Sequence, residues 1–234
     1  MSNGRKTLFV ISFLIIDLLL VSGIFMIRDM TSRNIIKKEV IALSELQFTE
    51  DNFNTDIKSS GEYAIVETAI KKYLDDYATE VQILLSVKDD ELLSGLLDSD
   101  NYLRDGPLFD ESFEYIELTK NNFNYNMDIL MNRISEEAIY NYIYNYDVDY
   151  DSVELYSNLL VDYNILGKIE EMQEMLKDEK VLIDSYIDSI SDVLTYLKNN
   201  SNMYNMVDGE IVFYDEVMQN QYNDLFNKTK RIFD

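Results

Sequence analysis

Four acidic side chains in one short segment have the type and spacing that best fit chemistry, namely the binding of Ca²⁺. Asp147, Asp149 and Asp151 alternate along the chain, and Glu154 follows three residues later. In an extended segment alternate side chains point to the same side, and carboxylate oxygens are the ligands that Ca²⁺ prefers. These four residues are therefore candidates for a weak calcium site.

The same segment resembles the opening of an EF-hand calcium loop but departs from it at two positions. The sixth residue is Ser152 instead of the glycine that makes the turn, and the twelfth is Asn158 instead of the bidentate glutamate. The alternative interpretation is a polar connector between two helices. In that case Asp149 or Asp151 is expected to cap the second helix.

Few residues in this chain are of the types that usually carry out catalysis. The sequence contains no histidine and no cysteine, which excludes the commonest general base, the usual zinc ligand sets and every thiol nucleophile. It also lacks the Gly-x-Ser-x-Gly, Walker A and Gly-x-Gly-x-x-Gly motifs. We therefore expect no enzymatic activity and no cofactor. A Ser–Lys or a paired-carboxylate site stays open, and the catalytic alternative is a cell-wall or phosphodiester hydrolase that uses carboxylates.

The stretch around the acidic segment is rich in tyrosine, and it has no basic residue between Arg133 and Lys168. Tyrosine is favoured at protein interfaces because it brings a large contact area at a low entropic cost. Such a surface fits a basic protein or the glycan rings of a cell wall. The alternative is that most of these tyrosines, at helical spacing, belong to the core with their hydroxyls in water. The predicted interaction surface consists of Tyr142, Tyr146, Tyr150 and Tyr156.

Composition limits the kinds of partner. The hydrophobic fraction of 47% and the 18 tyrosines and 11 phenylalanines indicate a folded chain. The formal net charge of −24 argues against binding to bare nucleic acid or to an anionic lipid surface, because phosphate groups repel it. With no cysteine, no disulfide framework is available. The expected partner is therefore a protein.

Residues 8–28 are almost uniformly apolar and predict a transmembrane anchor. At about 1.5 Å per helical residue, about twenty residues cross the ~30 Å hydrocarbon layer of a bilayer. The apolar run continues past the small pair Ser22-Gly23, so we predict an uncleaved, single-pass signal anchor instead of a cleaved export signal. Asp17 lies near its centre and either contacts a polar group on another transmembrane helix or is a tolerated acid.

Charges flank the predicted anchor on both sides. Residues 1–7 form a short tail that contains Arg5 and Lys6, as is usual for an exported signal anchor. The opposite flank carries four basic residues, which favour the reverse orientation: Arg28, Arg33, Lys37 and Lys38. We predict that the C-terminal body lies outside the cytoplasm, at the cell envelope.

Apolar residues spaced three or four apart predict helices for most of the remaining chain. Residues 29–60 are expected to form a juxtamembrane helix and a polar linker, and residues 61–234 an acidic helical bundle. Ser59 and Glu62 fit a capping box at the start of the first bundle helix. Near the C-terminus, the pair Asp208-Gly209 between two apolar runs predicts a small β-hairpin. The predicted fold is thus all-α, with a transmembrane helix, an antiparallel bundle and this hairpin.

These features predict a membrane-anchored, extracytoplasmic, non-catalytic interaction or sensing module. The alternative is an accessory subunit of a membrane transport or secretion complex, which would give Asp17 and the juxtamembrane helix a direct role. No motif in the sequence identifies a family or a biological process.

Overall fold

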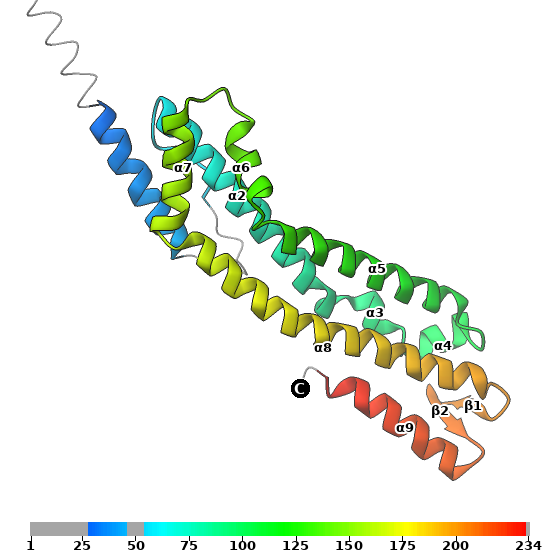
Figure 1. Ribbon diagram of the computed structural model, residues 1–234. Coiled ribbons are helices and arrows are strands. Elements are labelled where there is room, and N and C mark those ends of the chain that lie inside the picture. Colours follow the sequence, from blue (N-terminus) through cyan, green and yellow to red (C-terminus); the bar gives the residue numbers. More distant parts are fainter. Residues whose placement is uncertain (1–27, 46–53, 233–234) are drawn as a thin grey trace, which may run out of the picture. The chain divides into compact units, whose positions relative to one another are not determined.

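The computed structural model describes residues 28–45 and 54–232 and is mostly helical, with one small antiparallel sheet (Figure 1). A helix over residues 28–44 comes first. The elements that follow are α2 (Glu62–Leu85), the 3₁₀ turn η1 (Ser86–Asp89), α3 (Glu91–Gly95), α4 (Ser99–Asp105), α5 (Asp110–Asn132), α6 (Glu136–Tyr144), α7 (Tyr150–Asp162), α8 (Ile165–Asn199), β1 (Tyr204–Val207), β2 (Glu210–Phe213) and α9 (Glu216–Lys230).

Nearly all of the predicted anchor, residues 8–28 with Asp17, lies outside the described residues. Within residues 28–45 and 54–232, no helix is both long enough and apolar enough to cross a bilayer. The anchor and its orientation therefore stay predictions.

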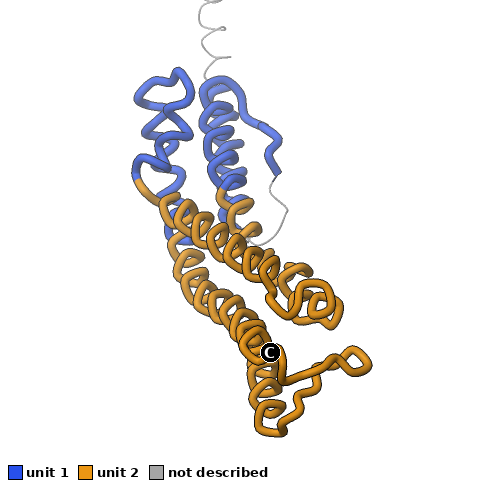
Figure 2. Tube along the Cα trace, turned by 90° about the vertical axis from the view of Figure 1, so that its right-hand side faces the viewer, with its two compact units in different colours: residues 1–76, 136–168 blue, residues 77–135, 169–234 orange. Residues whose placement is uncertain are grey.

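The chain divides into two compact units (Figure 2). Unit 1 comprises residues 1–76 and 136–168, and unit 2 comprises residues 77–135 and 169–234. The sequence predicts one bundle over residues 61–234 that follows a separate juxtamembrane segment. In the structure, the helix over residues 28–44 is instead grouped with the first part of α2 and with α6 and α7.

Unit 1 is built on the apolar stripes expected from the sequence. Val66, Ile70 and Tyr73 of α2 are fully buried, and so are Ile36 and Val40 of the helix over residues 28–44. The spacing of these residues places them on one face of each helix, which explains why both helices bury one side and expose the other. Further core side chains come from α6 and α7, namely Ile143, Leu159 and Leu160.

Unit 2 has its core along α5 and α8, where Leu130, Ile183 and Ile190 are buried. Buried Gln173 of α8 donates from Nε2 to the carbonyl oxygen of Leu130 at 2.8 Å. This hydrogen bond satisfies a side-chain amide that would otherwise be costly to bury and a carbonyl in the last turn of α5.

The predicted β-hairpin is confirmed. Strands β1 and β2 pair antiparallel, and Asp208 and Gly209 between them have φ values of 51° and 85°, as a type I′ turn requires. The ring of Phe213 lies 5.5 Å from that of Tyr196 in α8 and 5.8 Å from that of Tyr222 in α9. An isolated hairpin is marginally stable, and these aromatic contacts hold it on unit 2.

Glycines lie at two helix ends. Helix α4 ends at Asp105, just before Gly106-Pro107, and Gly167 lies in the first turn of α8, which begins at Ile165. A Cβ at Gly167 would lie 2.3 Å from Oδ1 of Asn164, so a larger residue at this position requires the asparagine side chain to move.

Candidate functional site: an acidic, tyrosine-rich helical hairpin

Helices α6 and α7 form a helical hairpin in unit 1, joined by residues 145–149. Helix α7 begins after Asp149, whose Oδ1 accepts a hydrogen bond from the backbone N–H of Ser152 at 2.8 Å. Hydrogen bonds from the backbone and the side chain of Ser152 hold the pKa of the Asp149 carboxyl below its ordinary value. The structure therefore confirms the interpretation of Asp149 as a helix cap.

The four calcium candidates do not form a cluster. Asp147, Asp151 and Glu154 are exposed, and Asp149 is engaged in capping. Among the described residues, no group of three or more acidic side chains is arranged to hold a metal ion. The geometry thus favours the polar connector over the calcium loop.

Two of the four predicted interface tyrosines are buried in unit 1. Tyr156 is 0% exposed, and its hydroxyl donates to the carbonyl oxygen of Ile139 at 2.8 Å. Tyr142 is also buried, and its hydroxyl donates to Oδ2 of Asp76 at 2.7 Å. Its ring packs edge-on against that of Tyr73, with centroids 5.3 Å apart. The prediction of a surface role is therefore wrong for Tyr142 and Tyr156, because both lie on the inward faces of their helices.

The exposed aromatic face of the hairpin has a different composition. Tyr150 is 77% exposed and Tyr146 is partly exposed, so both can take part in a surface contact. Tyr144 is 64% exposed but is not among the tyrosines predicted from the sequence. The ring of Tyr144 stacks on that of Tyr140, with centroids 5.6 Å apart and an interplanar angle of 21°. A residue two positions from buried Tyr142 lies on the opposite side of a helix, and this spacing is the signal that could have identified Tyr144.

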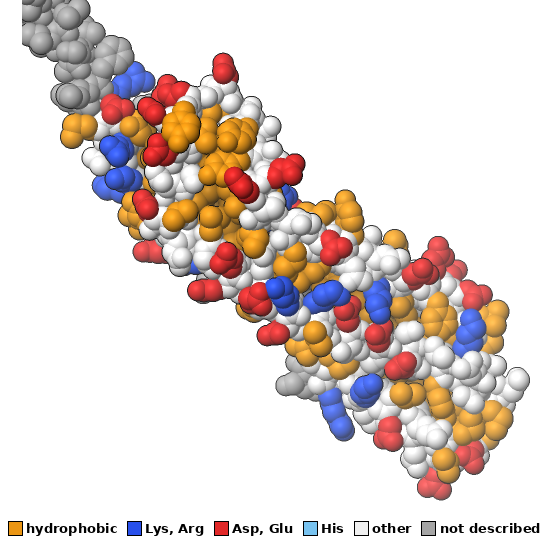
Figure 3. Space-filling view, viewed as in Figure 1, with side chains coloured by type: hydrophobic (Ala, Val, Ile, Leu, Met, Phe, Trp, Pro, Cys, Tyr) orange, Lys and Arg blue, Asp and Glu red, His pale blue; other side chains and the backbone are white. Residues whose placement is uncertain are grey.

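Hydrophobic side chains gather over α6 and α7, with acidic side chains around them (Figure 3). Neither helix contains a lysine or an arginine, whereas Glu136, Glu137, Asp151, Glu154 and Asp162 all lie on them. We call the surface formed by Tyr140, Tyr144, Tyr146 and Tyr150 with these five acids the acidic tyrosine face. Its rings can stack and its carboxylates can pair with cations.

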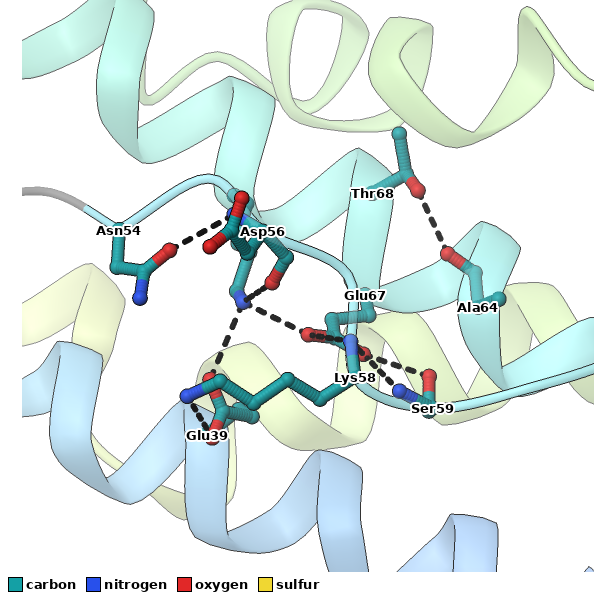
Figure 4. A network of polar contacts seen from close by, with 9 residues as sticks. Glu39, Asn54, Asp56, Lys58, Ser59, Ala64, Glu67 and Thr68 are labelled. Atoms are coloured by element: carbon teal, nitrogen blue, oxygen red, sulfur yellow. Dashed lines mark hydrogen bonds and ion pairs between the residues drawn. The ribbon is translucent and has the colours of Figure 1, made fainter.

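A buried ionic network lies elsewhere in unit 1 (Figure 4). The side chains of Lys71 and Glu67 are only 3% and 1% exposed, and Lys71 Nζ lies 2.7 Å from Glu67 Oε1 and 3.1 Å from Glu39 Oε2. Glu67 also accepts hydrogen bonds from the backbone N–H groups of Lys58 and Ser59 and from the Ser59 hydroxyl at 2.6 Å. The network thus ties the helix over residues 28–44 to α2 and to the segment between them.

This arrangement replaces the capping box expected at the start of α2. The carboxylate that reaches back to Ser59 belongs to Glu67, in the second turn of the helix, whereas Glu62 is exposed. Burial raises the pKa of the Glu67 carboxyl, but the hydrogen bonds from Lys71 and Ser59 outweigh it and bring the pKa below its ordinary value. The pKa of Glu39 is lowered in the same way, because hydrogen bonds from Lys58 and Lys71 outweigh burial.

These lowered pKa values predict how unit 1 responds to acid. Glu67 contributes its full stabilisation above the ordinary carboxyl pKa of 4.5, and it loses that stabilisation as the pH falls through the lower pKa of the folded state. In urea unfolding from pH 7 to pH 3, we expect Glu67→Gln to be least stable relative to the wild type at pH 7, with the difference shrinking below about pH 4.5. Glu62→Gln controls for the loss of one negative charge from the same helix. A difference that grows as the pH falls would contradict this assignment.

Unit 2 contains a surface pocket of about 450 Å³ between α3, α4 and α5. Buried Asn101 beside it donates to the carbonyl oxygen of Leu96 and to Ser112 Oγ, both at 2.9 Å, and accepts from Arg104. The side-chain amide of Asn101 therefore has hydrogen-bond partners on both its nitrogen and its oxygen. The remaining lining is acidic and apolar, with Glu91, Leu92, Asp98, Asp100, Glu111 and Tyr115.

No protein-family model, curated protein or solved structure matches this chain.

Proposed function

We propose that this chain is a membrane-anchored interaction module that binds a basic protein partner through the acidic tyrosine face. In this proposal residues 8–28 hold the protein in the cell membrane as a single-pass signal anchor, and the two helical units lie outside the cytoplasm at the cell envelope. The protein acts by docking and performs no chemistry of its own.

The observation that carries this proposal is the pairing of exposed rings with uncompensated acids on one helical hairpin. Tyr144 and Tyr150 are among the most exposed large hydrophobic side chains of the described residues, whereas Tyr142 and Tyr156 of the same hairpin are buried. Tyrosine contributes binding energy where it packs against a partner. Carboxylates around it attract a basic partner and repel an acidic one.

A second role, as an accessory subunit of a membrane transport or secretion complex, is favoured by the buried ionic network. Glu39 lies on the helix that follows the predicted anchor, and its ion pair with Lys71 ties that helix to α2. A movement of the anchor would then be transmitted to unit 1. If Asp17→Leu leaves the protein in the membrane but abolishes co-purification of a membrane partner, this second role is favoured.

The docking proposal predicts position-specific cross-linking in intact cells. A photo-reactive phenylalanine analogue at position 144 or 150 should capture a basic protein, because both side chains project from the acidic tyrosine face. Tyr125 of α5 is 66% exposed but lies in unit 2, so the same analogue at that position is the matched control. Capture at position 125 as strong as at positions 144 and 150 would contradict the proposal.

The same partner should depend on the two rings energetically. Interface tyrosines typically contribute about 1–2 kcal/mol each when truncated, so the double change Tyr144→Ala and Tyr150→Ala should weaken binding by about tenfold or more. The measurement is the affinity of the captured partner for purified protein in detergent. An affinity within about twofold of the wild type would contradict the role of this face.

A further inference from the structure

The two edges of the β-hairpin in unit 2 are not equivalent. The register pairs Asn205 with Val212 and Val207 with Glu210, and the N–H of Tyr214 donates to the carbonyl oxygen of Met203 at 3.0 Å. In an antiparallel pair, residues that face the other strand alternate with residues whose N–H and C=O point outward. The outward residues are therefore Tyr204 and Met206 on β1, and Ile211 and Phe213 on β2.

The outer edge of β2 is closed by one side chain of α9. Gln219 accepts from the N–H of Phe213 through Oε1 at 2.8 Å and donates from Nε2 to the carbonyl oxygen of Ile211 at 3.3 Å. One side-chain amide thus occupies the positions that a neighbouring strand would use. Covering an edge in this way prevents it from pairing with another chain.

The outer edge of β1 carries no such cover within the described residues. Neither a side chain nor a backbone group described in the structure is hydrogen-bonded to the outward N–H and C=O groups of Tyr204 and Met206. In Figure 1 the hairpin lies between the end of α8 and the start of α9, and β1 is the strand that follows α8. An open edge of this kind is a template for one additional strand.

The charge around the hairpin determines which strand fits. No lysine or arginine occurs between Lys198 and Lys228, whereas Asp208, Glu210 and Asp215 lie in or beside the hairpin. None of these acids lies on β1 itself, so their effect is long-range: they repel a second, equally acidic hairpin and attract a basic segment. Val207 of β1 is 50% exposed and offers an apolar contact to alternate side chains of the added strand.

We propose that the outer edge of β1 is a docking site for an extended, lysine- or arginine-bearing segment of a partner protein. The segment adds to the hairpin as a third strand and pairs with the backbone of Tyr204 and Met206. This site lies in unit 2 and does not depend on the acidic tyrosine face, so it stands even if the proposed function of that face fails.

The probe is a short, end-blocked peptide of alternating lysine and valine, added to the full chain in detergent. Binding is followed by fluorescence anisotropy, and pairing by amide hydrogen exchange. We expect saturating peptide to slow exchange at Tyr204 and Met206 by about tenfold or more, with little change at Phe213, whose N–H is already bonded to Gln219. A peptide of alternating glutamate and valine should not bind.

Two controls separate strand addition from simple charge attraction. The lysine–valine peptide with N-methyl groups on its pairing edge keeps its charge but loses its donors, so its affinity should fall by about tenfold. Met206→Pro removes an outward donor and spares the ladder partners Asn205 and Val207, so it should weaken binding similarly, whereas Met206→Leu should not.

Three results would overturn the proposal. One is the absence of peptide binding, and another is equal binding of the N-methylated peptide, which would show attraction by charge alone. The third is a wild-type dimer, detected by sedimentation, that dissociates in Met206→Pro, which would make this edge an interface between copies. Because the N-methylated peptide is tested on the wild-type protein, the conclusion holds even if Met206→Pro fails to fold.

Discussion

Replacing Lys71 with methionine is expected to lower the free energy of unfolding by about 3 kcal/mol or more, because it leaves a buried carboxylate without its ammonium partner. Methionine retains most of the apolar stem, so the change removes mainly the charge. Glu67 keeps its hydrogen bonds from Lys58 and Ser59, which limits the loss, but Glu39 and Glu67 are left close together with less positive charge between them.

The chain provides a matched control one residue away. Lys72 pairs with Asp76 at 3.2 Å, but its side chain is 60% exposed, and exposed ion pairs typically contribute about 0–1 kcal/mol. Lys72→Met should therefore change the free energy of unfolding by less than about 1 kcal/mol. Urea unfolding of the full chain in detergent, followed by circular dichroism, measures both variants. Equal effects of the two changes would show that the network does not stabilise unit 1.

The second large effect is expected at Tyr156. Replacing this fully buried ring with alanine creates a cavity between α6 and α7 and should cost about 3–5 kcal/mol of unfolding free energy. Tyr156→Phe keeps the ring but removes the hydroxyl that donates to the carbonyl oxygen of Ile139, so about 1 kcal/mol is expected.

Tyr150 is the control for this prediction because it belongs to the same tyrosine-rich segment but is exposed. Tyr150→Ala should alter the free energy of unfolding by no more than about 0.5 kcal/mol, although it should weaken partner binding. The pair of substitutions thus separates the tyrosines that hold unit 1 together from those available for docking. Comparable destabilisation by Tyr150→Ala and Tyr156→Ala would contradict this division.

The helices and the hairpin were predictable because their signals are local. A stripe such as Val66, Ile70 and Tyr73 repeats with the helical period and predicts both the helix and its buried face. The pair Asp208-Gly209 has the left-handed conformations that the two-residue turn demands. Both patterns depend on residues close together in the sequence.

The chemistry of the surfaces was harder to predict because it depends on contacts between distant segments. The sequence shows many tyrosines between residues 140 and 163, but only the packing against α2 determines that Tyr142 is inside and Tyr144 outside. The ionic network joins Glu39 to Lys71 across 32 positions. Each of these residues alone is indistinguishable from the many solvated charges of an acidic chain.

The closed edge of β2 illustrates the same limit. Gln219 is a polar residue in the first turn of α9, and nothing in the sequence assigns its amide to the backbone of Phe213 and Ile211. The difference between the two edges of the hairpin, on which the docking proposal for β1 depends, is therefore a property of the tertiary structure.

Protease access to a C-terminal tag placed after Asp234 is the most direct test of the proposed membrane-anchored module. The protein should remain with the membrane fraction, and its tag should be cleaved on intact protoplasts, because residues 8–28 hold the chain in the membrane with both units outside. Protection of the tag until the cells are lysed would place both units in the cytoplasm and contradict the proposed orientation. Release of the tagged chain into the medium without protease would show that residues 8–28 are a cleaved signal and contradict the anchor itself.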